Sequence, residues 1–385
     1  MPTARARFDD LRAGVAWEFP APARTLAASD LGEVPAVLAE VEAAVAGGSW
    51  AFGCFAYEAA VALDPTLAVG APVPGLPLAW FAVCAPPRVV PPVLASAPAA
   101  YRVGDWVAGW SEDQHRARVA AVRRGIAAGD TYQCNLTTRL TADLAGDTRA
   151  FYADLALGQR GAYNAYLDLG RFVVVSASPE LFFETRGRAI RMRPMKGTAR
   201  RGTTPAEDAA VVAALRASEK ERAENIMIVD LVRNDLARVA TTGSVRVTSL
   251  CRAERYETVY QLTSGVAARL RPDTGLADVF RALFPCGSVT GAPKARTMEL
   301  IRELEDGPRG VYCGAVGMVA PAGEAPFQAR FSVPIRTVLV DRATGLASYG
   351  TGGGITWSSE AAAEYAELLA KAEILTRLAR PAARR

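Results

Sequence analysis

Histidine is nearly absent from this chain, since His115 is the only one among 385 residues. A Ser-His-Asp or Cys-His catalytic centre would have to be built around that one residue, and metal sites with several histidines are excluded. The six cysteines are scattered and form no Cys-x-x-Cys pair, which indicates reduced, mostly buried thiols in a cytoplasmic protein rather than a disulfide framework. Any bound metal is therefore expected to be a hard cation held by carboxylates, such as Mg²⁺.

A strong net charge and a membrane-spanning run are also missing. The 44 Lys and Arg against 40 Asp and Glu leave a net charge of +4, too small at this length for a dedicated nucleic-acid binder. Residues 65–87 carry no charge, but they contain six prolines, which a spanning helix would not tolerate. No apolar stretch follows the basic residues of the N-terminal MPTARARFDDLRAG, so we expect no signal peptide. The expectation is a cytoplasmic protein with no nucleic-acid or membrane partner.

The order of predicted elements indicates an α+β protein. An Ala- and Pro-rich stretch at 85–100 is the expected boundary between an N-terminal segment, 1–100, and a larger region, 108–380. Periodicity and end signals predict helices at 34–45, from the Ser111 capping box to Gly129, and at 218–239, 276–284, 293–305 and 359–379. Strands are expected at 131–140, 171–178, 244–250, 311–320, 328–340 and 345–350, with a hairpin at 181–185 and 189–194. Because helices and strands interleave without regular β-α-β alternation, a Rossmann sheet is not expected.

The last predicted helix carries acidic and basic residues in one narrow stripe. Glu360, Glu364, Glu367 and Lys371 follow at spacings of four, three and four. At about 100° per residue, these positions share one helix face. Taken alone, the stripe is typical of a solvated face with a favourable Glu367–Lys371 pair.

The predicted helix at 218–239 also carries carboxylates, in the run EKERAENIMIVDLV. Residues after Glu221 and Glu224 are apolar on most faces, which predicts a buried helix. Buried carboxylates need a partner or a metal. Two carboxylate-bearing helices that face each other would form a Mg²⁺ site, and a structural role remains the alternative.

Two further segments could contact a ligand. YGTGGGITWSSE at 349–360 passes from a strand through glycines into a helix, which suits a close backbone approach to an anion or, equally, a tight structural turn. RMRPMKGTARRG at 191–202 is strongly basic and suits a solvated face or an anion pocket. Within it, Lys196 lies between Pro194 and Gly197 at the expected end of a strand, where a stiff backbone favours a reacting group.

Nine segments in order, from about residue 110 to 375, resemble the chorismate-utilising enzymes, and most closely their aminodeoxychorismate-forming members. They are GDTYQCNLT, SASPELFF, RPMKGTARRG, ERAENIMIVDLVRNDLARV, GSVTGAPKARTMELI, VYCGAVG, FSVPIRT, YGTGGGITWSSE and EYAELLAKAE. The resemblance implies two stacked β-sheets flanked by helices, an α/β/β/α core that binds Mg²⁺ and chorismate. It makes 108–380 the chorismate-binding catalytic region and 1–100 a segment like the N-terminal part of anthranilate synthase component I.

The resemblance also implies the residues of the site. Glu224 and Glu367 would hold Mg²⁺, with Glu221 and Glu364 beside it. The metal would take the ring carboxylate of chorismate, and Arg336, with its planar fork, and Tyr312 would hold the enolpyruvyl carboxylate. The remaining implied substrate contacts are Gly353, Gly354, Lys371, Thr198, Gln133 and Thr290.

Three positions bear on the reaction that the resemblance implies. Glu180 would be the general acid that protonates the departing C4 hydroxyl. Lys196 would attack ring C2 as that hydroxyl leaves, because lysine here is typical of the aminodeoxychorismate-forming members, whereas anthranilate and isochorismate synthases usually have alanine. Gln133 stands where the water-using members have a lysine that activates water, so ammonia is the expected nucleophile. Gln261 departs from the histidine of many relatives.

The expected partner is a separate glutamine amidotransferase subunit that supplies ammonia. Such glutaminases need a Cys-His pair, and the surroundings of His115, SEDQH, match no such motif. Two alternatives remain. Anthranilate synthase component I is disfavoured by Lys196 and by the absence of a Leu-Leu-Glu-Ser segment, and a phosphate- or nucleic-acid-binding module would use the basic 191–202 segment.

Overall fold

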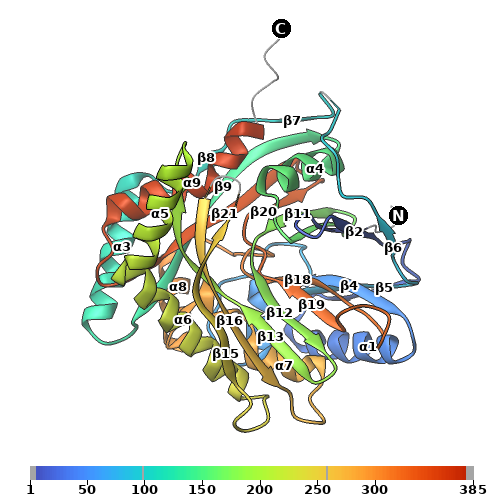
Figure 1. Cartoon of the computed structure of the whole chain (residues 1–385). Coiled ribbons are helices and arrows are strands. Elements are labelled where there is room, and N and C mark those ends of the chain that lie inside the picture. Colours follow the sequence, from blue (N-terminus) through green and yellow to red (C-terminus); the bar gives the residue numbers. More distant parts are fainter. Residues whose placement is uncertain (1–5, 98, 257–258, 379–385) are drawn as a thin grey trace.

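Two large antiparallel sheets face each other in the computed structural model, which describes residues 6–97, 99–256 and 259–378 (Figure 1). In the first sheet the strand order is β17 (Gly291–Ala292), β9 (Gln133–Gly146), β21 (Leu346–Ile355), β20 (Thr337–Asp341), β11 (Phe172–Ser178), β10 (Tyr163–Asp168), β1 (Ala6–Asp10), β2 (Val15–Glu18) and β6 (Arg88–Val90), and β7 (Tyr101–Val103) and β8 (Val107–Ala108) also pair with β9. In the second sheet the order is β14 (Met195–Arg200), β16 (Val259–Arg269), β13 (Ala189–Arg193), β12 (Leu181–Arg186), β19 (Ala329–Ser332), β18 (Ala315–Val319), β4 (Trp50–Phe55), β5 (Ala79–Cys84) and β3 (Arg24–Ala28), and β15 (Arg246–Arg255) pairs with β16.

Helices cover the outer faces of both sheets. They are α1 (Val34–Ala46), α2 (Ala60–Leu63), α3 (Glu112–Ala127), α4 (Thr148–Gln159), α5 (Pro205–Ala217), α6 (Glu219–Ala237), α7 (Leu276–Leu283), α8 (Lys294–Leu304) and α9 (Ala361–Leu378). Helices α4 and α9 pack on the first sheet, against β11 and β21, and α1 and α6 pack on the second, against β5 and β16. The predicted α+β class, with two stacked sheets flanked by helices, is confirmed.

The layer between the sheets combines aliphatic side chains with a group of packed aromatic rings. The rings of Phe19 and Phe52 lie 4.8 Å apart, and Trp50 and Trp80 pack around them. Each buried aromatic side chain removes a large apolar area from water, so this layer holds the two sheets together. Strand β1 pairs with β10 and β4 pairs with β18, so the N-terminal residues contribute to both sheets. The division at about residue 100 stays a prediction.

Several local predictions are confirmed. The predicted hairpin is β12 and β13, joined through Arg186 and Gly187. Ser111 caps α3, with its hydroxyl accepting from the Gln114 N–H and its own N–H donating to the Gln114 side chain. The helices predicted at 34–45, 218–239, 276–284 and 293–305 are α1, α6, α7 and α8. In the described part of the chain, no helix combines the length and hydropathy that a membrane crossing requires.

Three local predictions are wrong, and a fourth has the wrong bounds. The single strand expected at 328–340 is two strands in different sheets, β19 and β20, because the chain crosses between the sheets at 333–336. The strand at 311–320 begins only at Ala315. The glycines at 350–354 lie inside strand β21 and not in a loop. Helix α6 buries one face only, and Ile226 on its other face is 38% exposed.

Candidate functional site

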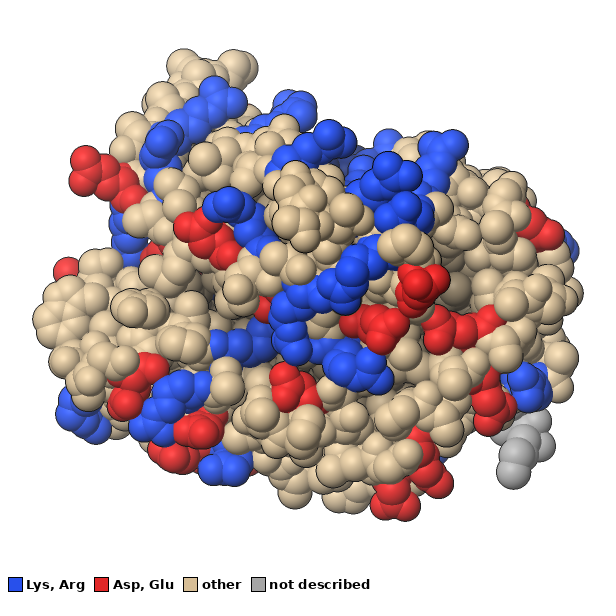
Figure 2. Space-filling view, turned by 90° about the horizontal axis from the view of Figure 1, so that it is seen from below, with Lys and Arg blue, Asp and Glu red and all other residues tan. Residues whose placement is uncertain are grey.

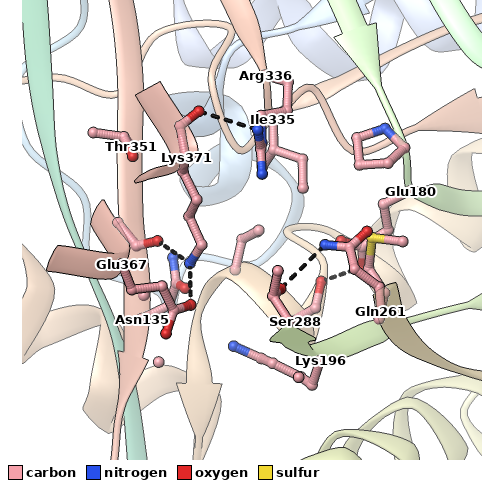
Figure 3. Close-up of a pocket in the computed structure, with 18 of the residues that line it drawn as sticks. Asn135, Glu180, Lys196, Gln261, Ser288, Ile335, Arg336, Thr351, Glu367 and Lys371 are labelled. Atoms are coloured by element: carbon pink, nitrogen blue, oxygen red, sulfur yellow. Dashed lines mark hydrogen bonds and ion pairs between the residues drawn. The ribbon is translucent and has the colours of Figure 1, made fainter. Parts of the chain in front are cut away.

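A cavity of about 110 Å³ opens where β9 and β21 of the first sheet approach β14 and β16 of the second, with α6 and α9 at its rim. Twelve of the fourteen predicted site residues line it: Glu180, Lys196, Thr198, Glu221, Glu224, Tyr312, Arg336, Gly353, Gly354, Glu364, Glu367 and Lys371. Figure 3 shows Glu180, Lys196, Glu367 and Lys371 around this one space. The structure therefore brings together segments that are almost 200 residues apart in sequence.

Glu180 lies at the base of the cavity, between β11 and β12, and is 2% exposed. Its carboxylate accepts a hydrogen bond of 2.6 Å from the Ser288 hydroxyl. Burial raises the pKa of Glu180 to about 7, although Ser288 and the positive charge of Lys196 act in the opposite direction. A carboxylic acid with this pKa is partly protonated near neutral pH and can donate a proton to a leaving group.

Lys196 is the second residue of β14, just after Pro194 ends the previous strand. Gly197 next to it has a φ of +83°, and a Cβ there would lie 2.7 Å from a Glu221 carboxylate oxygen. Glycine thus lets the strand pass close to α6 and turn Lys196 into the cavity (Figure 3). Within residues 6–97, 99–256 and 259–378, no hydrogen bond or ion pair holds its Nζ.

Four carboxylates gather at the rim of the cavity, Glu221 and Glu224 from α6 and Glu364 and Glu367 from α9. Burial and the neighbouring Glu221 raise the pKa of Glu224 to about 7, and burial with the nearby Glu367 raises that of Glu221. Burial opposes ionisation of Glu367 as well, yet its 2.8 Å pair with Lys371 lowers its pKa overall. The rim therefore holds more negative charge than its lysines compensate.

The rim suits a hard cation because all its ligand atoms are carboxylate oxygens. Among the residues that the structure describes, no three His, Cys, Asp or Glu side chains converge as a preformed metal cluster. Lys220 instead pairs with Glu364 at 3.6 Å and Glu224 at 4.0 Å. Magnesium in proteins is usually held by one or two carboxylates together with water and substrate oxygens, so these residues fit it.

Next to the acidic rim, the cavity also carries groups suited to an anionic ligand. Arg336 lies in the crossing between the sheets with a φ of +54°, and its guanidinium donates to the Lys371 carbonyl at 3.1 Å. Lys371 in turn donates to the Gly352 carbonyl at 2.7 Å. The Tyr312 ring lies directly against Gly350, where a Cβ would collide with it. Each of these cations is held in place by backbone contacts before any ligand binds.

Two predicted residues lie outside the cavity lining. The Thr290 hydroxyl is buried and donates to carbonyls of its own turn, at Cys286 and Gly287. Gln133 is fully buried just behind Gly354, and within the described part of the chain neither polar atom of its amide has a hydrogen-bond partner. Gln261 does line the cavity and donates to the Thr198 hydroxyl at 3.3 Å. The roles assigned to these residues stay predictions.

Several residues of the site were not singled out from the sequence. Ser288 and Lys220 contact the predicted acids directly, and Asn135, Tyr349 and Thr351 complete the wall. The spacing of four residues between Lys220 and Glu224 could have predicted their ion pair from the sequence. No sequence spacing predicts the long-range contact of Ser288 with Glu180. His115 is buried between Trp110 and Tyr365 and does not line the cavity.

The basic segment at 191–202 does not form a free cationic surface. Arg191 pairs with Glu184 at 2.8 Å, Arg193 with Glu254 at 3.2 Å and Arg201 with Asp208 at 2.8 Å. On the face of the molecule drawn in Figure 2, Lys and Arg side chains are scattered with Asp and Glu side chains among them. These ion pairs disfavour the nucleic-acid-binding alternative.

Comparison with known proteins places these observations in a family. A sequence model of chorismate binding enzymes matches residues 11–377. The chain is 42% identical over 285 residues to anthranilate synthase component 1 of Streptomyces coelicolor, covering 74% of this chain and 55% of that protein. It is 47% identical over 255 residues to the aminodeoxychorismate synthase of Streptomyces griseus, covering 66% and 34% respectively. It is 40% identical over 294 residues to aminodeoxychorismate synthase component 1 of Klebsiella aerogenes, covering 76% and 62%.

Those alignments span 34% to 62% of the length of these three relatives. The fold matches over more of the chain. The solved structure of anthranilate synthase component I from Streptococcus pneumoniae superposes with a TM-score of 0.80 at 25% identity, covering 98% of this chain and 93% of that one.

Proposed function

Because the chain belongs to the family of chorismate binding enzymes, we propose that it converts chorismate and ammonia to 4-amino-4-deoxychorismate, for the formation of 4-aminobenzoate and folate. One observation carries the proposal. The Lys196 amine, which has no hydrogen-bond or ion-pair partner among the residues that the structure describes, lines the same cavity as the buried acid Glu180. A nucleophile and a general acid that line one small cavity are the two groups that a covalent displacement requires. Two relatives named as aminodeoxychorismate synthases, at 47% and 40% identity, support the same reaction.

The reaction proceeds in two displacements. The Lys196 amine forms a bond to ring C2, the ring double bonds shift, and the C4–O bond breaks as Glu180 gives its proton to the departing hydroxyl, which leaves as water. Ammonia then forms the C4–N bond, the double bonds shift back, and the C2–N bond breaks with its electron pair returning to Lys196, while the new C4 ammonium gives up one proton that restores Glu180 to its acid form. The net change is chorismate and ammonia to aminodeoxychorismate and water.

Glu224 and Glu367 would hold Mg²⁺, with Glu221 and Glu364 beside them. When bound, the metal would supply positive charge against the ring carboxylate of the substrate. Arg336, with Tyr312 beside it, would hold the enolpyruvyl carboxylate through its planar guanidinium. Lys371 and the Gly353–Gly354 backbone would contact the ring carboxylate, and Thr198 would complete the lining around the substrate, with Gln133 and Thr290 buried behind that lining.

Anthranilate synthesis is the second candidate. Its support is the 42% identity to anthranilate synthase component 1 of Streptomyces coelicolor. In that reaction ammonia adds at C2 and pyruvate is eliminated, so the space over C2 must be open. Lys196 occupies the wall of this cavity, which favours amination at C4.

The ammonia would come from a separate glutaminase subunit. Three relatives named as component 1 support a second component, and the only histidine is buried at 2% exposure, away from the cavity. We also propose a cytoplasmic location, which the six unpaired cysteines support.

The direct test uses the purified chain with chorismate, Mg²⁺ and an ammonium salt. Products are identified by mass and by coupling to an aminodeoxychorismate lyase, and pyruvate and anthranilate fluorescence are followed in parallel. Lyase-dependent 4-aminobenzoate supports the proposal. Anthranilate with equal pyruvate would establish the second candidate instead, and no chorismate consumption would refute both.

A further inference from the structure

Behind the active-site cavity, an arginine and a glutamate are buried together. The side chains of Arg309 and Glu305 are 3% and 7% exposed, and the guanidinium donates to both carboxylate oxygens, at 2.7 and 2.9 Å. Neither residue lines the cavity, so the proposed mechanism leaves this pair without a part in the reaction. A buried ion pair often adds little stability beyond what apolar side chains of the same volume would give, so its other contacts indicate its role.

The guanidinium of Arg309 also holds two backbone carbonyls of the active-site wall. It donates to the Val289 carbonyl at 2.7 Å and to the Asn135 carbonyl at 2.8 Å. Val289 and Asn135 both line the cavity. Their segments lie side by side, since the Asn135 N–H donates to the Thr290 carbonyl at 2.7 Å. A guanidinium presents its N–H donors in a rigid planar fork, so Arg309 fixes the spacing of these two segments.

One of the two segments carries the partner of the proposed acid. Ser288 and Val289 are consecutive residues of the short helix η3 (Gly287–Val289). The Ser288 hydroxyl donates to the Glu180 carboxylate at 2.6 Å. Because Arg309 holds the Val289 carbonyl, η3 cannot shift without breaking that hydrogen bond. The place of Ser288 beside Glu180 therefore depends on Arg309.

Arg309 is itself held by residues from the N-terminal part of the chain. Glu58 is 2% exposed and accepts hydrogen bonds from the backbone N–H groups of Arg309, at 2.7 Å, and Gly310, at 3.1 Å. The guanidinium carbon lies 4.6 Å from the centre of the Tyr57 ring, a favourable cation–π contact. Together with Glu305, these contacts fix the guanidinium from two sides before any ligand binds.

We propose that Arg309 is a positioning residue for the reaction, which holds Ser288 beside Glu180 through the Val289 carbonyl. Glu305, Glu58 and the Tyr57 ring keep Arg309 in place for this task. The inference rests on the proposed function, in which Glu180 is the general acid. Arg309 acts through Ser288 and does not itself reach the cavity.

The readout is the alkaline limb of the pH–rate profile, which reports the pKa of Glu180. Besides Ser288, the titratable groups that act on Glu180 or respond to its charge are Arg193, Lys196, Cys286 and Cys313. The Ser288 hydrogen bond stabilises the Glu180 anion, so a displaced Ser288 should raise the pKa of Glu180 and move the limb to higher pH. Variants that keep every charge report this displacement alone.

Two such variants loosen the contact. Arg309→Lys keeps the positive charge but loses the fork that reaches both carbonyls. Glu305→Asp keeps the negative charge but is one methylene shorter, so it releases Arg309 with a smaller loss of packing. Arg296→Lys and Glu303→Asp, on the exposed face of α8, are the matched controls. Circular dichroism and urea titration verify that each variant is folded.

Both test variants should move the limb upward by about half a pH unit or more, and both controls should leave it in place. The double variant of Arg309→Lys with Ser288→Ala should match Ser288→Ala alone within about 0.3 of a pH unit, because the two changes remove the same hydrogen bond. A structural role alone would lower the urea midpoint and leave the limb unmoved.

An unmoved limb in Arg309→Lys, or in Glu305→Asp should the lysine variant not fold, would overturn the inference. Shifts that simply add in the double variant would overturn it too, since Arg309 would then act through a group other than Ser288. A wild-type chain that forms no aminated product would instead refute the proposed function itself.

Discussion

Replacing Ser288 with alanine should move the alkaline limb of the pH–rate profile to higher pH. Ser288 donates a 2.6 Å hydrogen bond to the carboxylate of Glu180, which is 2% exposed. This bond favours the ionised form, and burial holds the pKa of Glu180 at about 7 in spite of it. A general acid must be protonated to act, so turnover should fall as pH rises through that pKa.

The size of the shift follows from the strength of the lost bond. A hydrogen bond to a charged group contributes about 1.5–3 kcal/mol, and about 1.4 kcal/mol corresponds to one pH unit. The pKa of Glu180 should therefore rise by about one to two units in Ser288→Ala, and the alkaline limb should move with it. The pKa rises because the lost hydrogen bond stabilised the carboxylate anion, and without it the protonated acid is favoured.

The assay measures kcat from pH 5 to 10 at saturating chorismate, with free ammonia held constant at every pH. Ser288→Thr keeps a hydroxyl and should restore the wild-type limb, which separates the hydrogen bond from a mere packing defect. Glu180→Gln should abolish the limb and lower kcat by about 10²–10⁴. An unmoved limb in Ser288→Ala, or one moved to lower pH, would refute Glu180 as the acid.

Three further predictions concern the metal site, the source of ammonia and the stability of the fold. Glu224→Gln and Glu367→Gln should each severely reduce Mg²⁺-dependent turnover with an unchanged circular dichroism spectrum, and full activity of both variants in EDTA would contradict the metal assignment. Glutamine should support turnover only after a glutaminase subunit is added, while ammonium salts act alone; amination from glutamine by the rigorously purified chain would refute this. Arg309→Ala should destabilise the fold by about 3–5 kcal/mol in urea titrations, because Arg309 and its 2.7 Å partner Glu305 are 3% and 7% exposed. The exposed Arg296→Ala is the matched control and should leave the urea midpoint unchanged, and equal midpoints for the two variants would contradict this reasoning.

The helices and hairpins that depend on local periodicity and capping could be predicted from the sequence. Helix α6, with Ser218 accepting from the Glu221 N–H, and the β12–β13 hairpin follow from short-range signals. The alternation in the segment 328–340 continues through Phe331, Val333 and Ile335, so it predicts one strand. In the structure the two halves belong to different sheets, because alternation reports which residues are buried and not which sheet they join. Pro334 was the one local sign of the crossing.

The site residues that belong to family motifs could be predicted from the sequence. The contacts between distant residues that tune these groups could not. Lys196 and Glu180 come from separate motifs, and the structure brings both to one cavity. The contact of Ser288 with Glu180 joins residues 108 positions apart, and no sequence spacing reports it. Gln133 was predicted to contact substrate, yet it lies behind Gly354 rather than on the cavity wall. Its position depends on how β9 and β21 pack, which the sequence does not specify.

Covalent attack by Lys196 is the central claim, and product analysis of Lys196→Arg and Lys196→Ala tests it most directly. If Lys196 attacks C2, both variants should lose amination at C4 by orders of magnitude, since arginine is a very poor nucleophile. Lys196→Ala should in addition open the space over C2 and give some 2-amino product. If Lys196 only pairs with a substrate carboxylate, arginine would serve as well. Vigorous formation of 4-amino-4-deoxychorismate by Lys196→Arg, resolved by chromatography under steady-state conditions, would contradict the covalent mechanism.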